Sequence, residues 1–85
     1  MIIIDTRSPL EYQASHVPGA INIAPEQFMV GLPPELAHTP KDEHIVLYCR
    51  SGARSNTCSH ILSTHGFTNI TNGINEGHVT KMLTT

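Results

Sequence analysis

The fold of this chain is indicated by the stretch Ile45-Val46-Leu47-Tyr48-Cys49-Arg50-Ser51-Gly52-Ala53-Arg54-Ser55. Its first five residues are apolar, which predicts a strand buried on both faces at the centre of a sheet. The next three residues break this pattern. From Ala53 to about His65, a helix with one apolar face is predicted by the spacing of Cys58, Ile61, Leu62 and His65. Gly66 is expected to end that helix.

Other apolar runs alternate with helix-like segments on both sides of this stretch. Further strands are expected at residues 2–4, 20–23 and 67–71, and a last helix at residues 74–83. Asn72-Gly73 is expected to form the turn between the last strand and this helix. The alternation is typical of an α/β domain in which a small, mainly parallel sheet is flanked by helices.

Proline residues indicate two more helix starts. Ser8 as N-cap, Pro9 at the first helical position and Glu11 closing a capping box predict a short helix that ends near Ser15. Pro25 is expected to begin another helix, which cannot continue through residues 33–34 because both are proline. In that segment, the residues expected to pack in the core are Phe28, Met29 and Leu32.

The size and composition of the chain exclude several classes of function. With 85 residues, a formal net charge of −2 and 14% charged residues, one domain over residues 1–85 is expected. The five Lys and Arg residues are scattered, so neither nucleic acid nor an anionic membrane is expected as a partner. No apolar run approaches the roughly 18 residues of a membrane span.

The cysteine count and the N-terminus indicate the compartment. Two cysteines are too few for a disulfide framework, and no signal-peptide pattern precedes the first strand. A reducing, cytoplasmic setting is therefore expected. A periplasmic setting stays open if a signal peptide has been removed.

The loop after the central strand is the candidate functional site. An open α/β sheet binds ligands beyond the carboxyl ends of its strands and beside helix N-termini, and Cys49 lies at such a place. The loop N–H groups, the positive end of the helix and the guanidinium groups of Arg50 and Arg54 all favour the thiolate. They are expected to lower the pKa of Cys49 by one or more units from about 8.5.

Small residues in the same loop suit the binding of an anion. Gly52 can adopt a positive φ, and with Ser51 and Ala53 it lets consecutive N–H groups converge on one point. The planar guanidinium of Arg54 is suited to an oxyanion, and Ser55 is expected to cap the following helix. The alternative is that the cysteine is only a small buried apolar residue. Two neighbouring arginines make that a poor core, because buried charges need partners.

Four ordered segments resemble the signatures of the single-domain rhodanese family of sulfurtransferases. The family patterns are Asp-x-Arg-x-x-x-Glu-Tyr, His-Ile-x-Gly-Ala, Cys-Arg-Ser-Gly-x-Arg-Ser and Gly-Phe. The matching segments are Asp5-Thr6-Arg7-Ser8-Pro9-Leu10-Glu11-Tyr12, His16-Val17-Pro18-Gly19-Ala20, Cys49-Arg50-Ser51-Gly52-Ala53-Arg54-Ser55 and Gly66-Phe67. The resemblance extends from the first strand to at least Asn75 and implies a rhodanese-like fold.

The resemblance also implies a reaction, with Cys49 as the catalytic residue of a thiosulfate sulfurtransferase. Cys49 would attack the outer sulfur of a small anionic donor such as thiosulfate, displace sulfite and become a persulfide. Cyanide or a thiol acceptor would then remove the sulfur. The donor would be bound by Arg50, Ser51, Gly52, Ala53 and Arg54, and no metal or organic cofactor is required.

Two alternatives of other classes stay open. One is a persulfide carrier or interaction module, which receives sulfur on Cys49 from a partner protein and has little turnover on small donors. The other is a phosphatase or arsenate reductase. Phosphatases of this fold use Cys-x5-Arg, whereas Cys49 and Arg54 form Cys-x4-Arg, and the shorter loop makes a tighter cradle.

Other residues have structural interpretations. Asp5 and Arg7 are expected to tie the end of the first strand to neighbouring loops, and Glu11 to share that ion pair or to complete the capping box. Cys58 is expected in the core, with a resolving role toward Cys49 as the alternative. His16 is expected to be a structural hydrogen-bonding residue. The remaining histidines are expected at the surface: His38, His44, His60, His65 and His78.

The chain departs from the family pattern in two places. The helical segment that usually precedes the first strand is missing, which leaves one face or edge of the sheet less covered, so a monomer or weak dimer is expected. Where many relatives carry Gly-Gly-x-x-x-Trp, this chain has Asn72-Gly73-Ile74-Asn75-Glu76-Gly77-His78 and no Trp. That part of the wall of the site therefore differs from the family pattern.

Overall fold

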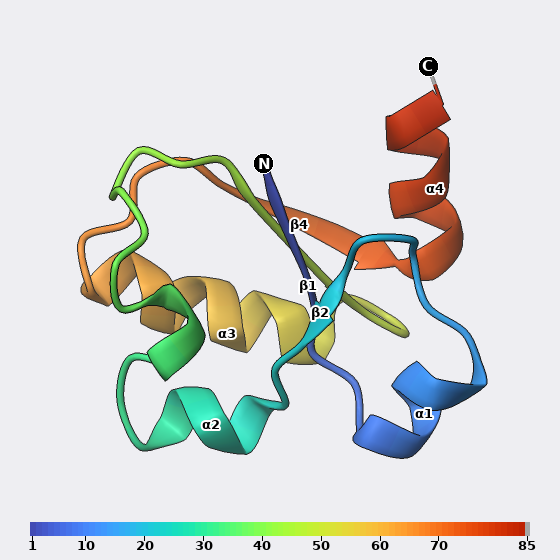
Figure 1. Ribbon diagram of the computed structural model, residues 1–85, viewed down its shortest axis with the longest axis horizontal. Coiled ribbons are helices and arrows are strands. Elements are labelled where there is room, and N and C mark those ends of the chain that lie inside the picture. Colours follow the sequence, from blue (N-terminus) through green and yellow to red (C-terminus); the bar gives the residue numbers. More distant parts are fainter. Residues whose placement is uncertain (85) are drawn as a thin grey trace.

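A computed structural model describes residues 1–84 as a parallel sheet with helices on both faces (Figure 1). The strands are β1 (Ile2–Asp5), β2 (Ile21–Asn22), β3 (Ile45–Cys49) and β4 (Ile70–Asn75). The helices are α1 (Pro9–Ala14), α2 (Pro25–Met29), the 3₁₀ turn η1 (Pro34–Leu36), α3 (Ala53–Thr64) and α4 (Glu76–Thr84). The α/β fold class expected from the sequence is confirmed.

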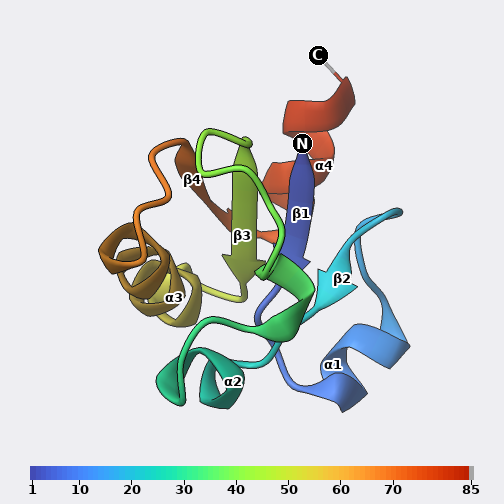
Figure 2. The same cartoon turned by 60° about the vertical axis from the view of Figure 1, so that its left-hand side comes forward.

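The four strands lie in the order β2-β1-β3-β4, and each neighbouring pair is parallel. All residues of β3 are buried, as its apolar run predicts. The carboxyl ends of β1 and β3 point the same way, toward the end of the sheet where α1 and α2 lie (Figure 2). This is the end at which an open α/β sheet offers its ligand site.

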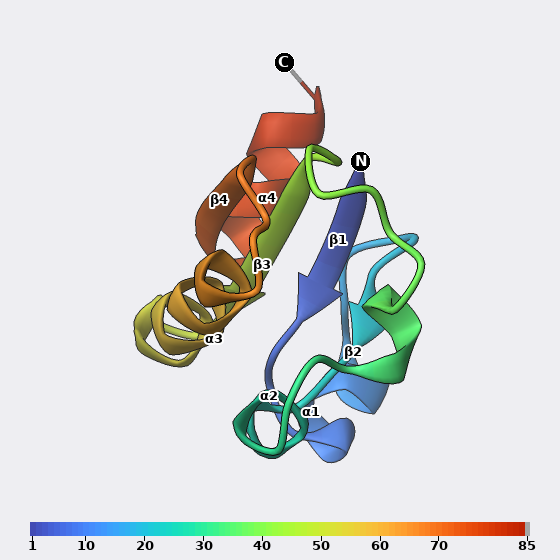
Figure 3. The ribbon, with the colours of Figure 1, turned by 90° about the vertical axis from the view of Figure 1, so that its left-hand side faces the viewer.

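Each face of the sheet has its own apolar cluster. The cluster beneath α2, η1 and α3 consists of Ile4, Ile23, Phe28, Leu36, Ile45, Leu47, Cys58, Leu62 and Phe67. The cluster on the face of α4 consists of Ile3, Val17, Ala20, Val46, Tyr48 and Val79, with Tyr12 of α1 packed against it. β1 and β3 contribute to both clusters, because successive side chains of a strand point to opposite faces. α3 and α4 therefore lie on opposite sides of the central strands (Figure 3).

The start of α1 has the predicted capping box. The N–H of Glu11 donates to the Ser8 hydroxyl at 3.2 Å, and the N–H of Ser8 donates to the Glu11 carboxylate at 2.9 Å. Two backbone donors at the helix start thus find partners. The box fixes where the chain turns after β1 and therefore where the carboxylate of Glu11 lies.

The segment at Asn72-Gly73 is a strand, so the turn expected there is wrong. Leu47 pairs with Asn72 and Tyr48 with Ile74, which leaves Gly73 as an extra residue, a bulge in β4. A Cβ atom on Gly73 would lie 2.4 Å from Cγ2 of Val79. The glycine therefore allows close packing against α4 and does not reverse the chain. Ile74 belongs to the strand, so α4 begins later than expected, at Glu76.

A few core assignments also differ from expectation. Phe28 is buried, but Met29 is 64% exposed, because α2 is only five residues long and turns one side to the core. His65 is exposed just beyond α3. The second strand covers only Ile21–Asn22. Within residues 1–84, no helix has the length and apolar character needed to cross a membrane.

Candidate active site

Cys49 ends β3, and the loop that follows folds back over its sulfur. The residue is 2% exposed. Gly52 has a φ of 92° and is the N-cap of α3. Its N–H donates to Cys49 Sγ at 3.1 Å, and the Ser55 hydroxyl lies 3.6 Å from the same sulfur. The left-handed backbone at Gly52, which the sequence predicts, turns this N–H toward the sulfur.

The loop makes the Cys49 thiol more acidic than usual. Burial alone raises the pKa of a thiol, but the N–H groups of Ser55, Ser51 and Gly52 and the Ser55 hydroxyl outweigh burial. Together they lower the pKa of Cys49 to about 7. From the sequence, loop N–H groups, the positive helix end and the two guanidinium groups are all expected to contribute. In the structure the main lowering contributions come from hydrogen bonds within the loop.

The alkylation rate of Cys49 is expected to rise with pH around a midpoint of about 7. The thiolate reacts and the thiol does not, so below the pKa the rate falls about tenfold for each pH unit. An ordinary cysteine would have its midpoint at about 8.5. Iodoacetamide alkylation across pH, with the modified peptide identified by mass spectrometry, measures this midpoint. A midpoint at the ordinary value would contradict the hydrogen bonds seen at the sulfur.

Arg54, expected to bind the donor, is held by a carboxylate of α1. Its Nη1 lies 2.9 Å from Glu11 Oε1 and its Nη2 lies 3.3 Å from Glu11 Oε2. The guanidinium lowers the pKa of Glu11 to about 2. Glu11 in turn raises the pKa of Arg54, and the Cys49 thiolate adds to this effect. Glu11 therefore completes the capping box and pairs with Arg54, whereas the ion pair with Arg7 considered from the sequence does not form.

The other residues expected to bind the donor lie in the loop after Cys49 and at the start of α3. Gly52 is buried, whereas Arg50, Ser51 and Ala53 are exposed. Ser51 contributes its N–H to the hydrogen bonding of Cys49. Of these residues, Gly52 and Ser51 direct N–H groups at the Cys49 sulfur, whereas donor binding by Arg50 and Ala53 stays a prediction.

Ser55 bonds across the loop and does not cap α3, so that expectation is wrong. The N-cap is Gly52, and the buried Ser55 hydroxyl lies 2.7 Å from Asn72 Oδ1 and 3.2 Å from the Gly52 carbonyl oxygen. The Asn72 amide also donates to that carbonyl at 3.1 Å. From the sequence, Asn72 is expected only in a turn and in the segment that departs from the family pattern, not as a partner of Ser55. Its partners lie 17 and 20 residues away in the chain, where no local pattern could indicate it.

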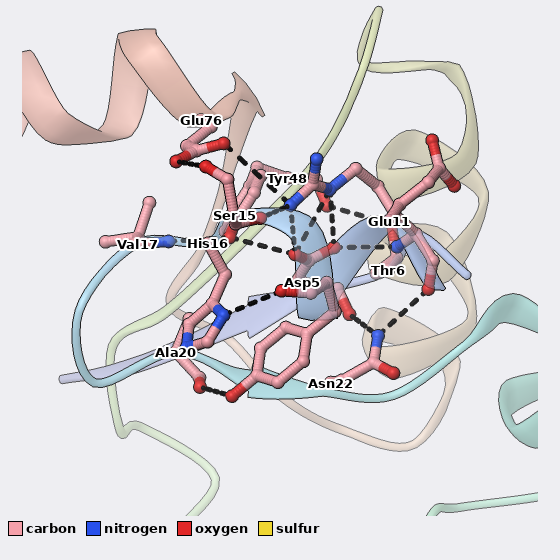
Figure 4. A network of polar contacts seen from close by, with 12 residues as sticks. Asp5, Thr6, Glu11, Ser15, His16, Val17, Ala20, Asn22, Tyr48 and Glu76 are labelled. Carbon is pink, nitrogen blue, oxygen red and sulfur yellow. Dashed lines mark hydrogen bonds and ion pairs between the residues drawn. The ribbon is translucent and has the colours of Figure 1, made fainter. Parts of the chain in front are cut away.

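Asp5 and Arg7 form a buried ion pair at the end of β1. Figure 4 shows the network of polar contacts in which Asp5 lies. The Nη2 of Arg7 lies 2.7 Å from Asp5 Oδ2 and donates to the Ser15 carbonyl oxygen at 2.5 Å. The Tyr48 hydroxyl donates to the same carboxylate at 3.0 Å and accepts the N–H of Val17 at 3.0 Å. These contacts join β1, β3 and the segment after α1, as a structural pair would. A hydrogen-bond partner for Tyr48 could be expected from the sequence, because the hydroxyl of a buried tyrosine needs one.

Cys58 and the histidines lie apart from this chemistry. Cys58 is fully buried in the cluster beneath α3, and burial raises the pKa of its thiol to about 11. This environment favours core packing over a resolving role, which needs an accessible thiolate. The Nδ1 of His16 lies 2.8 Å from the Tyr12 carbonyl oxygen, and the Nε2 of half-buried His44 contacts Thr71. In the part of the chain that the structure describes, no group of His, Cys, Asp and Glu could hold a metal ion.

Comparison with known proteins places this fold and loop in a family. Residues 1–78 match the rhodanese-like domain. The chain belongs to the rhodanese-like domain family. Thiosulfate sulfurtransferase PspE of Escherichia coli is 36% identical over 69 residues, covering 81% of this chain and 64% of that protein. A sulfurtransferase of Allochromatium vinosum is 32% identical over 72 residues, covering 85% of this chain and 64% of that protein.

Rhodanese domains also occur in longer relatives and in solved structures of the same fold. A tRNA uridine(34) hydroxylase of Pectobacterium carotovorum is 31% identical over 71 residues, but the chain spans only 20% of that protein. A solved Escherichia coli rhodanese with anions has a TM-score of 0.76 and 32% identity, covering 91% of this chain and 88% of that one. The fold and family are therefore shown, and the chain spans less than two thirds of its sulfurtransferase relatives.

Proposed function

We propose that this rhodanese domain is a sulfurtransferase that carries a sulfur atom as a Cys49 persulfide. The observation that supports this best is the set of loop N–H groups directed at the sulfur, with the Gly52 N–H donating to Cys49 Sγ at 3.1 Å and those of Ser51 and Ser55 adding to it. They favour a thiolate, with a pKa of about 7, and a thiolate is the nucleophile that such a transfer needs. The sulfurtransferases among its relatives support the same assignment.

In the first half-reaction, the Cys49 thiolate attacks the outer sulfur of thiosulfate or a similar small anionic donor. A new bond forms between the two sulfur atoms as the donor's own S–S bond breaks, and sulfite leaves with the electron pair of that bond. The loop N–H groups and the Arg54 guanidinium stabilise the negative charge of the donor and the leaving group. The product on the protein is a Cys49 persulfide.

In the second half-reaction, an acceptor thiolate or cyanide attacks the outer sulfur of the persulfide. The acceptor gains that sulfur, and Cys49 leaves as a thiolate, ready for the next donor. The two half-reactions share one enzyme intermediate, so ping-pong kinetics are expected. The reaction as written needs no redox cofactor, because every electron pair stays within the sulfur atoms and the acceptor.

A persulfide carrier is the second candidate. The matching region makes up only 20% of a tRNA uridine(34) hydroxylase, so a rhodanese domain of this kind also occurs as one part of a longer protein. In this reading Cys49 receives sulfur from a partner protein and passes it on, with little turnover on thiosulfate. Both candidates need the acidic Cys49 thiol, and they differ in the source of the sulfur.

The purified protein is expected to gain the mass of one sulfur atom when thiosulfate is added. Subsequent addition of cyanide should restore the original mass and release thiocyanate. Intact-protein mass spectrometry measures both steps, and peptide mapping should place the added sulfur on Cys49 and not on Cys58. Absence of the added sulfur would contradict transfer from thiosulfate and favour the carrier. Turnover of p-nitrophenyl phosphate would instead indicate phosphatase chemistry.

A further inference from the structure

The side chain of Asn72 connects β4 to the loop around Cys49 in a fixed orientation. Its Nδ2 donates to the Gly52 carbonyl oxygen at 3.1 Å, and its Oδ1 accepts the N–H of Ile74 at 3.0 Å. A backbone carbonyl only accepts and a backbone N–H only donates, so these bonds settle which end of the amide is oxygen. The oxygen must therefore be the atom that faces the Ser55 hydroxyl, 2.7 Å away.

The Ser55 hydroxyl has one proton and three acceptors around it. These are Asn72 Oδ1 at 2.7 Å, the Gly52 carbonyl oxygen at 3.2 Å and Cys49 Sγ at 3.6 Å. Because Oδ1 of an amide carries no proton, the shortest contact requires the hydroxyl to donate to Asn72. In that arrangement the hydroxyl can accept a proton from the thiol but cannot donate to a thiolate.

We propose that Asn72 is a positioning residue for Cys49, which acts by competing with the sulfur for the hydroxyl proton of Ser55. The proposal rests on the proposed role of Cys49 as the nucleophile. When Cys49 is a thiol, its S–H points to Ser55 and the Ser55 hydroxyl donates to Asn72, so both protons have an acceptor. When Cys49 becomes a thiolate, Ser55 must leave Asn72 to donate to the sulfur. Asn72 thus favours the thiol and raises the pKa of Cys49, whereas the N–H groups of the loop lower it.

The sequence departs from the family pattern at the same place. Asn72-Gly73 stands where the Gly-Gly pattern is expected from the family resemblance, and a glycine has no side chain with which to compete for the proton. The bulge at Gly73 and the φ of 72° at Ile74 hold the Ile74 N–H against the amide oxygen. The irregular backbone of β4 therefore keeps Asn72 in place.

Charged groups around Cys49 are separate from this competition. From α3, Arg54 and the Cys58 thiol interact electrostatically with Cys49, and from α1, Glu11 acts through Arg54. Arg50 follows the cysteine in the exposed loop, and β4 contributes the uncharged Asn72. Replacing Asn72 with alanine leaves each of these charges in the chain. A change in the pKa of Cys49 would then report on hydrogen bonding.

The test measures the pKa of Cys49 by iodoacetamide alkylation across pH in the wild type, Asn72→Ala, Ser55→Ala and the double variant. We expect Asn72→Ala to lower the pKa by about half a unit to one unit, because the hydroxyl is then free to donate to the charged sulfur. In the Ser55→Ala background the same substitution should cause no lowering. Asn69→Ala is the matched control, because Asn69 is an exposed asparagine just before β4, and it should leave the pKa unchanged.

Two results would overturn the proposal: an unchanged or raised pKa in Asn72→Ala, or the same lowering with and without the Ser55 hydroxyl. Thermal unfolding followed by circular dichroism establishes that each variant is folded. If Asn72→Ala does not fold, Asn72→Gly removes the same amide and replaces Asn72→Ala in the single and double variants. Alkylation needs no sulfur donor, so a failure in this experiment is distinct from a failure of thiosulfate to form the persulfide.

Discussion

Cys49→Ser is expected to lose more than about a thousandfold of the rate of sulfur transfer from thiosulfate to cyanide. A serine hydroxyl stays protonated near neutral pH even with the Gly52 N–H directed at it, and it cannot form a persulfide. The loop would still bind the donor, so the loss should appear in kcat and not in the KM for thiosulfate. Thiocyanate formed per minute, measured over a range of thiosulfate concentrations, tests this expectation.

Cys58→Ala is the matched control for that experiment. Cys58 is the other cysteine of the chain, and its thiol is fully buried among apolar side chains of the core. Its replacement should leave thiocyanate formation within a few-fold of wild type. If both variants lose activity equally, the transfer does not depend on Cys49 in particular. Substantial turnover by Cys49→Ser would show that the reaction does not pass through a Cys49 persulfide.

Asp5→Ala is expected to lower the free energy of unfolding by about 3–5 kcal/mol. The carboxylate is completely buried and holds the guanidinium of Arg7, itself only 9% exposed, together with the hydroxyl of Tyr48. Its removal leaves a buried positive charge without its partner and a buried hydroxyl without its acceptor. The total free energy of unfolding of a small domain is about 5–15 kcal/mol, so this variant should be close to unfolding at room temperature.

Urea unfolding followed by circular dichroism gives the change in unfolding free energy, with Asp42→Ala as the control. Asp42 is an exposed aspartate in the loop before β3, and its replacement should change the free energy by no more than about 0.5 kcal/mol. A similarly small change in Asp5→Ala would mean that the ion pair does not hold β1 to its neighbours. The comparison keeps the loss of one negative charge the same in both variants.

Features set by neighbouring residues could be predicted from the sequence. The capping box of Ser8 and Glu11 and the left-handed backbone at Gly52 each depend on a few consecutive residues, and both are present. The buried strand at Ile45–Cys49 follows from its own apolar run. The loop around Cys49 was located for the same reason, since a strand, a glycine and a helix start adjoin one another in the chain.

Features set by distant partners could not be predicted in this way. Asn72-Gly73 has the composition of a turn, but the glycine is required by Val79 across the bulge, a contact that only the folded chain creates. Glu11 and Arg54 are separated by 43 residues in the chain, so no local pattern indicates that they pair. The Ser55 hydroxyl, expected to cap its own helix, instead donates to Asn72 Oδ1, which lies 17 residues away in the chain.

The all-parallel pairing of the strands has a consequence for folding of the chain during its synthesis. β1 pairs with β3, and β3 pairs with β4, so each central ladder must wait for a segment made much later than its partner. The loop around Cys49 depends in addition on Asn72, which belongs to the last strand. A chain growing from its N-terminus on the ribosome therefore cannot complete the pairing of β3 with β4, or the contacts of Asn72 with the loop around Cys49, until β4 has emerged.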